Sequence, residues 1–372
     1  MFIHIMFFDK NVRYKVLHDY QICTNCVMDT SAPEIVFERD GTCSFCNGVK
    51  YHFGRNWFPD EYGEQQKFEK YSQIKLNGVG KKYDCILGLS GGLDSAAVAL
   101  EAVENGLRPL ALHIDAGWNT NESVSNVERL TSQLNIDLHT VVIDWDEMRK
   151  LQIAYLRSNV MNQDTPQDHA IFTTMYKFLA KQEVTTLLSG VNYTSESVQP
   201  ASWGYTYADG KQVKYIAKKF GKFSIKNFPI MKIKQFKKIA DKKYLDVFRP
   251  LDYGKYDPIN FSKQLSEKIG WKAYGAKHAE SLFTNFVHNV YLFEKYGIDK
   301  RRNHASSLII SGLMSRLQAV EELDKPPIEI IDRNRVMNAV SSKLEISIIE
   351  MEEYLSGPKV DHYSLPNDSS KI

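Results

Sequence analysis

The sequence predicts an α/β protein with a doubly wound parallel sheet, an N-terminal zinc ribbon and a mostly helical C-terminal region. Three observations lead to this prediction. From Tyr83 onward, short apolar runs alternate with segments of helical periodicity, as in repeated βαβ units. Two Cys-x2-Cys pairs precede that region, with a spacing typical of a metal ribbon. A Ser-Gly-Gly turn directly follows the first apolar run, where a nucleotide-binding sheet places its phosphate loop.

The length of the chain predicts more than one core. A chain of 372 residues exceeds the ~100 to 200 residues usual for one domain. We expect an extension over residues 1–20, a zinc ribbon over 21–60, a nucleotide-binding domain over 61–255 with a Lys-rich insertion at about 205–243, and a helical substrate or partner region over 256–372.

The cysteines predict a structural zinc site. Cys23 and Cys26 are followed after 16 residues by Cys43 and Cys46. Four thiolates at this spacing can surround one Zn²⁺ tetrahedrally, and no position is then open for catalytic water. Two disulfides are the competing interpretation, but they need an oxidising compartment that nothing else in the sequence indicates. The fifth cysteine, Cys85, lies in an apolar run and is expected to be a buried strand residue.

Charge and hydropathy narrow the class of protein. The formal net charge is +2, which disfavours nucleic acid as a partner. Residues 211–243 nevertheless hold 12 Lys and one acid, interleaved with aromatic residues. This strip could bind phosphates, a partner or an anionic membrane surface, or it could be a solvated hairpin and helix. No segment approaches the ~20 apolar residues of a membrane span, and the apolar stretch 1–8 ends too early for a secretory signal. We therefore expect a cytoplasmic protein without a transmembrane segment.

The region after residue 82 is expected to alternate strands and helices, with Asn121 and Asp144 as plausible helix N-caps. In a doubly wound sheet the ligand binds beyond the carboxyl ends of the strands, so the loops that follow these ends should converge. We predict strands at 83–89, 109–115, 138–144 and 184–189, and helices at 94–105, 121–134, from 145 onward and at 167–181.

The first of these loops is expected to hold an anion. Gly91 and Gly92 let the backbone approach a ligand, while Ser90, Ser95 and the amides at the helix start point toward it. The loop lacks the GxxxxGK[ST] pattern of a Walker A motif and has no lysine. Asp94 would repel a phosphate unless a cation intervened, so we expect it near Mg²⁺ or in orienting the loop. By itself the segment could also be a tight strand-to-helix turn.

The segment SGGLDS after an apolar strand resembles the PP-loop of the ATP pyrophosphatase superfamily, which has the adenine nucleotide alpha hydrolase-like fold. Members of that superfamily cleave ATP between the α and β phosphates. The resemblance implies that Ser90 to Ser95 hold pyrophosphate with Mg²⁺. It also implies that His113 and Asp115 line the adenosine and that Gly190 lies near the α-phosphate.

Several segments together resemble the bacterial N-acetyl sugar amidotransferases, which make acetamidino sugars for O-antigen or pseudaminic-type acids. They are CTNCVMDTSAPEIVFERDGTCSFC, LGLSGGLDS, YGAKHAESLFTNF and YGIDKRRNHASSLIISG. This resemblance implies that ATP adenylates the acetamido oxygen of an N-acetyl or nucleotide sugar. Ammonia from a separate glutaminase subunit, like that of imidazole glycerol phosphate synthase, then gives an amidine, AMP and pyrophosphate.

The distal segments are where substrate recognition is expected. Lys277 and His278 are candidate catalytic residues. Arginine forks bind phosphate or carboxylate in pairs of hydrogen bonds, which suits a nucleotide sugar. A solvated helix start and a satisfied histidine are the competing interpretations, and Asp168 and Glu196 could be caps or site residues. The candidate substrate-binding residues are Glu280, Lys300, Arg301 and Arg302.

Two other functions remain open from the residues. A tRNA thiolation enzyme can combine a zinc ribbon with a PP-loop, although no second cysteine pair occurs in the α/β region. A non-enzymatic ATP-binding assembly protein could use the ribbon as a docking module. AMP formation that depends on a sugar, and not on tRNA, would separate these from the amidotransferase hypothesis.

Overall fold

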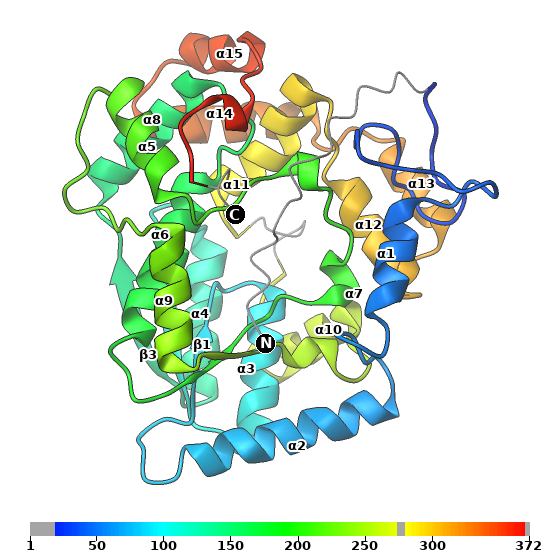
Figure 1. Ribbon diagram of the computed structural model, residues 1–372, viewed down its shortest axis with the longest axis vertical. Coiled ribbons are helices and arrows are strands. Elements are labelled where there is room, and N and C mark those ends of the chain that lie inside the picture. The colour runs from blue at the N-terminus through cyan, green and yellow to red at the C-terminus, as the bar shows by residue number, and fades with distance from the viewer. Residues whose placement is uncertain (1–18, 274–279, 369–372) are drawn as a thin grey trace.

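The computed structural model describes residues 19–273 and 280–368 (Figure 1). Its centre is a parallel sheet in the order β3-β2-β1-β4-β5. The strands are β1 Cys85–Gly88, β2 Pro109–Asp115, β3 Asp137–Val142, β4 Thr186–Leu188 and β5 Asp246–Phe248. The first three are added in one direction from β1 and the last two in the other, so the topological switch point lies between β1 and β4.

Helices cover both faces of the sheet because successive strand residues point to opposite sides. Leu87 belongs to one core and Ile86 to the other. The first core packs α2 Glu61–Asn77, α3 Leu93–Glu104, α4 Asn121–Gln133 and α10 Pro258–Ile269 on one face. The second packs α5 Trp145–Ser158, α6 Thr165–Leu179 and α8 Gly210–Lys219 on the other face. The predicted α/β class with a doubly wound parallel sheet is confirmed.

The predicted caps are partly corrected. Asp144 caps α5 by accepting the Glu147 amide at 2.9 Å, as expected. The cap of α4 is Thr120, whose hydroxyl accepts the Ser123 amide at 3.2 Å, and Asn121 is the first helical residue. Strand β5 was not predicted, because a run of three strand residues is too short to show a period.

The four-cysteine element shares its core with the C-terminal helices (Figure 1). Its only α-helix in the described chain is α1 Ser44–His52, which begins at the second cysteine pair. The amide of Val27 bonds the Ser306 hydroxyl at 3.2 Å, across most of the sequence. The helices of this region are α11 Leu282–Phe286, the π-helical segment Val287–Tyr296, α12 Arg301–Ile310, α13 Arg316–Leu323, α14 Ile330–Leu344 and α15 Ile348–Ser356.

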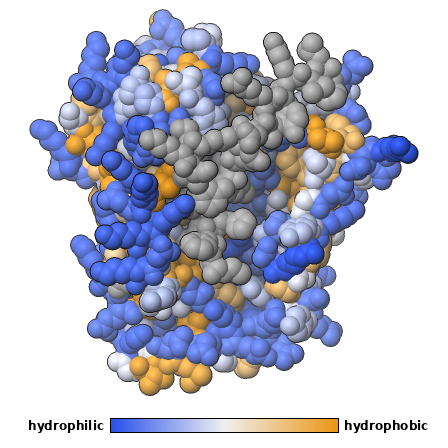
Figure 2. All heavy atoms as spheres, in the orientation of Figure 1, coloured by the Kyte–Doolittle hydropathy of each residue, from blue (hydrophilic) through white to orange (hydrophobic). Residues whose placement is uncertain are grey.

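The Lys-rich strip forms α8 and α9 Ile233–Lys243, and its aromatic residues face inward. Phe228 and Phe236 are buried, whereas lysines such as Lys214, Lys218 and Lys238 are exposed. Figure 2 shows a largely hydrophilic surface over α9. Among the described residues, no helix is both long and apolar enough to cross a bilayer.

Candidate active site and metal centre

A cleft of about 1600 Å³ opens at the carboxyl ends of four strands. It is lined by the loops after β1, β2, β4 and β5, together with residues of α6, α7 Tyr193–Glu196, α10 and α12. The loop after Asp144 does not line it, contrary to expectation. The reason is that β3 is the edge strand farthest from the switch point, whereas the unpredicted β5 lies beside β4.

The Ser-Gly-Gly loop lines this cleft and leads directly into α3. Gly92 occupies the N-cap position of α3 and offers no side-chain acceptor to the first-turn amides. Ser90 Oγ accepts the Gly92 amide at 3.1 Å and lies 3.2 Å from Ser95 Oγ. Together with the positive end of the α3 dipole, this arrangement can hold an anion.

Two glycines of the site are required by space and backbone conformation. Gly91 has φ +83°, and a Cβ there would lie 2.3 Å from the Ser123 carbonyl oxygen. A Cβ on Gly190 would lie 2.9 Å from the Ser95 amide nitrogen. Gly190 therefore allows the loop after β4 to approach the start of α3.

At the end of β2, His113 faces the cleft, whereas Asp115 bonds the backbone of the loop that follows. His113 Nδ1 donates to the Leu89 carbonyl at 2.8 Å, so Nε2 is the nitrogen that accepts from Asn119 at 3.2 Å. His113 and Asn119 line the cleft. Asp115 is not among the lining residues, and its Oδ1 accepts the Gly117 amide at 2.8 Å.

An acidic wall lies on the α6 and α7 side of the cleft. Asp164 is at the N-cap position of α6 but does not cap it, and its Oδ1 accepts from the Thr284 hydroxyl at 3.2 Å. Burial raises the pKa of Asp164 to about 7. Burial, followed by the charge of Asp164, raises the pKa of Asp168 well above its usual range. Asp168 and Glu196 both line the cleft.

Arg249 is a cleft residue that the sequence reasoning missed. It directly follows β5, and its Nε lies 2.6 Å from Asp252 and donates to the Val191 carbonyl at 3.1 Å. Its guanidinium also lies over the Tyr193 ring, 4.7 Å from the centroid. The charge sits beside the loop that carries Gly190. The Asp-Val-Phe run before Arg249 is too short to have revealed this strand from the sequence.

Of the predicted substrate-binding residues, one lines the cleft and three lie outside it. Glu280 lines the cleft, whereas Lys300, Arg301 and Arg302 do not. Burial lowers the pKa of Lys300 to about 8, while the charge of Asp164 acts in the opposite direction. Lys277 and His278 lie outside the described residues.

The two distal arginines make structural contacts. Arg301 pairs with Asp299 at 2.6 Å and donates to the Lys325 carbonyl at 2.8 Å. Arg302 pairs with Asp29 at 3.1 Å and donates to the Val27 carbonyl at 2.9 Å. These bonds tie α12 to the chain after α13 and to the four-cysteine element.

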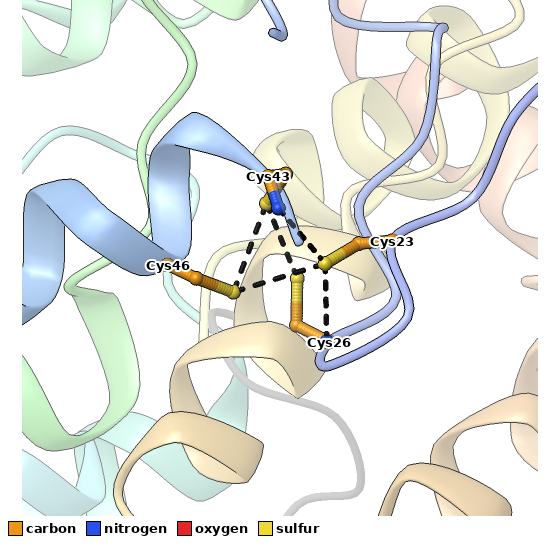
Figure 3. Close-up of side chains that lie close together, drawn as sticks. All are labelled: Cys23, Cys26, Cys43 and Cys46. Carbon is orange, nitrogen blue, oxygen red and sulfur yellow. Dashed lines mark hydrogen bonds between the residues drawn. The ribbon is translucent and has the colours of Figure 1, made fainter. Parts of the chain in front are cut away.

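The four cysteines form one compact group (Figure 3). Their sulfur atoms all lie within 4.8 Å of one another. Three of the separations are 3.9 Å for Cys23–Cys46, 3.7 Å for Cys26–Cys43 and 3.7 Å for Cys43–Cys46. A tetrahedron with metal–sulfur bonds of about 2.3 Å has edges of about 3.8 Å, so the group fits a single metal ion.

Backbone amides support the thiolate form of this group. The amides of Cys26 and Cys43 donate to Cys23 Sγ at 3.4 and 3.3 Å. Cys85 differs from the four, because it is buried in β1 and burial raises its pKa to about 12. Cys85 is therefore a buried thiol of the strand, as expected.

The fold and cleft define an α/β domain with a glycine-rich anion loop at its switch point, and comparisons with known proteins agree with this class. Residues 84–260 match the family model for the queuosine biosynthesis protein QueC. Residues 280–372 match the C-terminal domain of lipopolysaccharide biosynthesis protein WbpG-like chains. The two matches support a place in the PP-loop ATP pyrophosphatase superfamily.

Individual relatives are more distant. An uncharacterised protein of Methanocaldococcus jannaschii is 27% identical over 129 residues, which are 34% of this chain and 44% of that protein. The match thus spans less than half the length of the relative. The NH3-dependent NAD synthetase of Campylobacter jejuni has a TM-score of 0.30 at 17% identity, covering 72% of this chain and 98% of its own. The U34-tRNA thiolase NcsA of Methanococcus maripaludis, described with a [4Fe-4S] cluster, has a TM-score of 0.33 at 16% identity, covering 73% and 82%.

Proposed function

We propose that this protein is an AMP-forming amidotransferase that converts the acetamido group of an N-acetyl or nucleotide sugar into an acetamidino group. The observation that carries the proposal is the lysine-free Ser-Gly-Gly loop, which opens into a cleft that is also lined by residues of the WbpG-like region. Those residues are Glu280, Ser281, Thr284, His288, His304 and Leu308.

An amide is a poor electrophile, and the proposed chemistry activates it by adenylation. The acetamido oxygen attacks the α-phosphorus of ATP and displaces pyrophosphate, which the amides at the start of α3 hold. Ammonia then adds to the imidate carbon, and AMP leaves with the original oxygen. Mg²⁺, near Asp94, would neutralise charge on the phosphates. The carboxyl group of Asp164, whose pKa burial raises to about 7, is suited to take the proton that the nitrogen loses.

The ammonia source is proposed to be a separate glutaminase subunit. Of the five cysteines of the chain, four form the metal group and the fifth is the buried Cys85, so none is suited to act as a glutaminase nucleophile. Delivery through a partner would keep the reactive imidate away from water.

For the metal centre we propose Zn²⁺ with a structural role. Four thiolates also bind iron–sulfur clusters. A cluster places several iron and sulfide atoms between the thiolates and would hold them farther apart, whereas the separations of 3.7 to 3.9 Å suit one ion. Metal analysis of the purified protein, with its visible absorption spectrum, distinguishes the two. Reduced thiols at this site also suit the cytoplasm, which is the compartment we propose.

The test of the function is an incubation with ATP, Mg²⁺, ammonium and a panel of N-acetyl nucleotide sugars. AMP, pyrophosphate and a sugar lighter by the difference between O and NH should form together. AMP formation that requires tRNA, with no sugar modified, would contradict the proposal and favour tRNA modification. ATP binding without turnover on any acceptor would favour a non-enzymatic assembly protein.

A further inference from the structure

The Ser-Gly-Gly loop is held from outside by two side chains that flank one helix. The Tyr256 hydroxyl donates to Asp94 Oδ1 at 2.6 Å, and the Trp271 indole donates to the Gly91 carbonyl at 3.2 Å. Tyr256 lies just before α10 and Trp271 just after it. Both side chains are buried, at 4% and 3% exposure. Helix α10 also packs against α3, so α10 and its two flanking residues contact both the loop and the helix that follows it.

The bond from Tyr256 joins a neutral donor to a charged acceptor. A phenol carries its proton at neutral pH, so the Tyr256 hydroxyl is the donor of this bond and Asp94 Oδ1 is the acceptor. Hydrogen bonds of this kind are short and about twice as strong as those between neutral groups. Asp94 itself lies in the first turn of α3 and lines the cleft. The phenol therefore restricts how this carboxylate faces the cleft.

We propose that Tyr256 is a positioning residue, which fixes the Asp94 carboxylate in the orientation that binds the Mg²⁺ accompanying ATP. A carboxylate that is already oriented loses less conformational freedom when the ion binds. The inference rests on ATP use within the proposed function, and it is independent of the sugar and of the ammonia source.

The matched control is a second buried phenol, Tyr71 of α2, which bonds another carboxylate of α3. Tyr71 is also buried, at 2% exposure, and donates to Glu101 Oε2 at 3.2 Å. Glu101 belongs to α3, like Asp94, but neither Tyr71 nor Glu101 lines the cleft. Tyr71→Phe therefore removes a buried phenol-to-carboxylate bond from α3 without touching the site.

The experiment measures the binding of a fluorescent ATP analogue at increasing Mg²⁺, for the parent, Tyr256→Phe and Tyr71→Phe. Tyr256→Phe should raise the half-saturating Mg²⁺ concentration by about tenfold, the effect of losing one hydrogen bond to a charged group. Binding without Mg²⁺ should stay unchanged. Tyr71→Phe should keep the Mg²⁺ dependence of the parent, although both variants should lose some thermal stability.

A double variant shows whether Tyr256 acts through Asp94. Asp94→Asn and Asp94→Asn/Tyr256→Phe should have the same Mg²⁺ dependence, since the carboxylate that Tyr256 orients is absent in both. A further loss in the double variant, or equal Mg²⁺ dependence in Tyr256→Phe and Tyr71→Phe, would overturn the inference. Binding of ATP by the parent that ignores Mg²⁺ would also overturn it. Intact Mg²⁺-dependent binding without amidation would instead contradict only the proposed function.

Discussion

Arg249 shows how a single residue can acquire a site role from its neighbours. Its guanidinium is held by Asp252, the Val191 carbonyl and the Tyr193 ring. These contacts fix the plane of the fork while the side chain still lines the cleft. An arginine held in this way can bind a phosphate or carboxylate with little further loss of freedom.

We predict that Arg249→Lys weakens ATP binding or acceptor binding by about tenfold, since lysine keeps the charge but loses the planar fork. Titration with each ligand separately identifies which of the two is affected. Arg335→Lys is the control, because Arg335 makes an exposed ion pair with Asp332 away from the cleft. Unchanged affinity for both ligands in Arg249→Lys would exclude Arg249 from the binding site.

Asp164 gives a pH dependence of stability. Its pKa rises from 3.8 to about 7 through burial. A carboxyl group whose pKa is raised in the folded state stabilises that state fully at pH values below its unfolded pKa. This stabilisation is lost as the pH rises through the folded pKa. The melting temperature of Asp164→Asn should therefore fall less than that of the parent between about pH 4 and about pH 7. Equal slopes in thermal unfolding across this range would contradict the assignment.

At the scale of elements, the four-cysteine group is supported by α12 and α13. Arg316 donates to the carbonyls of Cys23 and Cys26 at 3.0 to 3.1 Å, and Arg302 reaches Val27 and Asp29. The turn that carries Cys23 and Cys26 is thus held by helices nearly 300 residues away in the sequence. Its geometry therefore depends on the C-terminal region.

We predict that Arg316→Met speeds metal release to a chromophoric chelator and lowers stability by about 1 to 3 kcal/mol, since buried carbonyls lose a charged donor. Arg335→Met, which removes only an exposed ion pair, should change neither quantity by a comparable amount. Metal release at the rate of the parent would show that the knuckle keeps its form without α13.

At the scale of the whole molecule, the four-cysteine group is connected to the cleft. Helix α12, which contacts the four-cysteine element, is also bonded to α7. His304 Nδ1 bonds the Ser195 carbonyl at 3.0 Å, and the Ser311 hydroxyl, directly after α12, donates to the Thr194 carbonyl at 3.1 Å. Helix α7 follows the loop that carries Gly190. Loss of the metal should therefore disturb a wall of the cleft.

Cys43→Ser should accordingly lose the metal, lower the melting temperature and weaken ATP binding, because unfolding of the ribbon removes part of the core that supports α12 and α7. Metal content, thermal unfolding and ATP titration of the same preparation check this. A metal-free variant that binds ATP like the parent would show that the two sites are independent.

Local patterns predicted the elements whose signal lies within a short stretch of chain. Examples are the Cys-x2-Cys pairs, the apolar run before Ser90 and the capping side chain of Asp144. Each is a pattern of residues that are close in sequence, so it can be recognised without knowledge of the fold. The parallel sheet followed from the alternation of such elements.

Which distant residues meet depends on packing that no short stretch of sequence encodes. Arg302 suggested anion binding by its chemistry, yet packing of α12 against the four-cysteine element directs it to Asp29. Arg249 enters the cleft because three residues pair as an edge strand beside β4, which no local period reveals. The glycine loop and the four-cysteine group could therefore be recognised from the sequence, since their signals are local. The composition of the remaining walls depends on long-range packing.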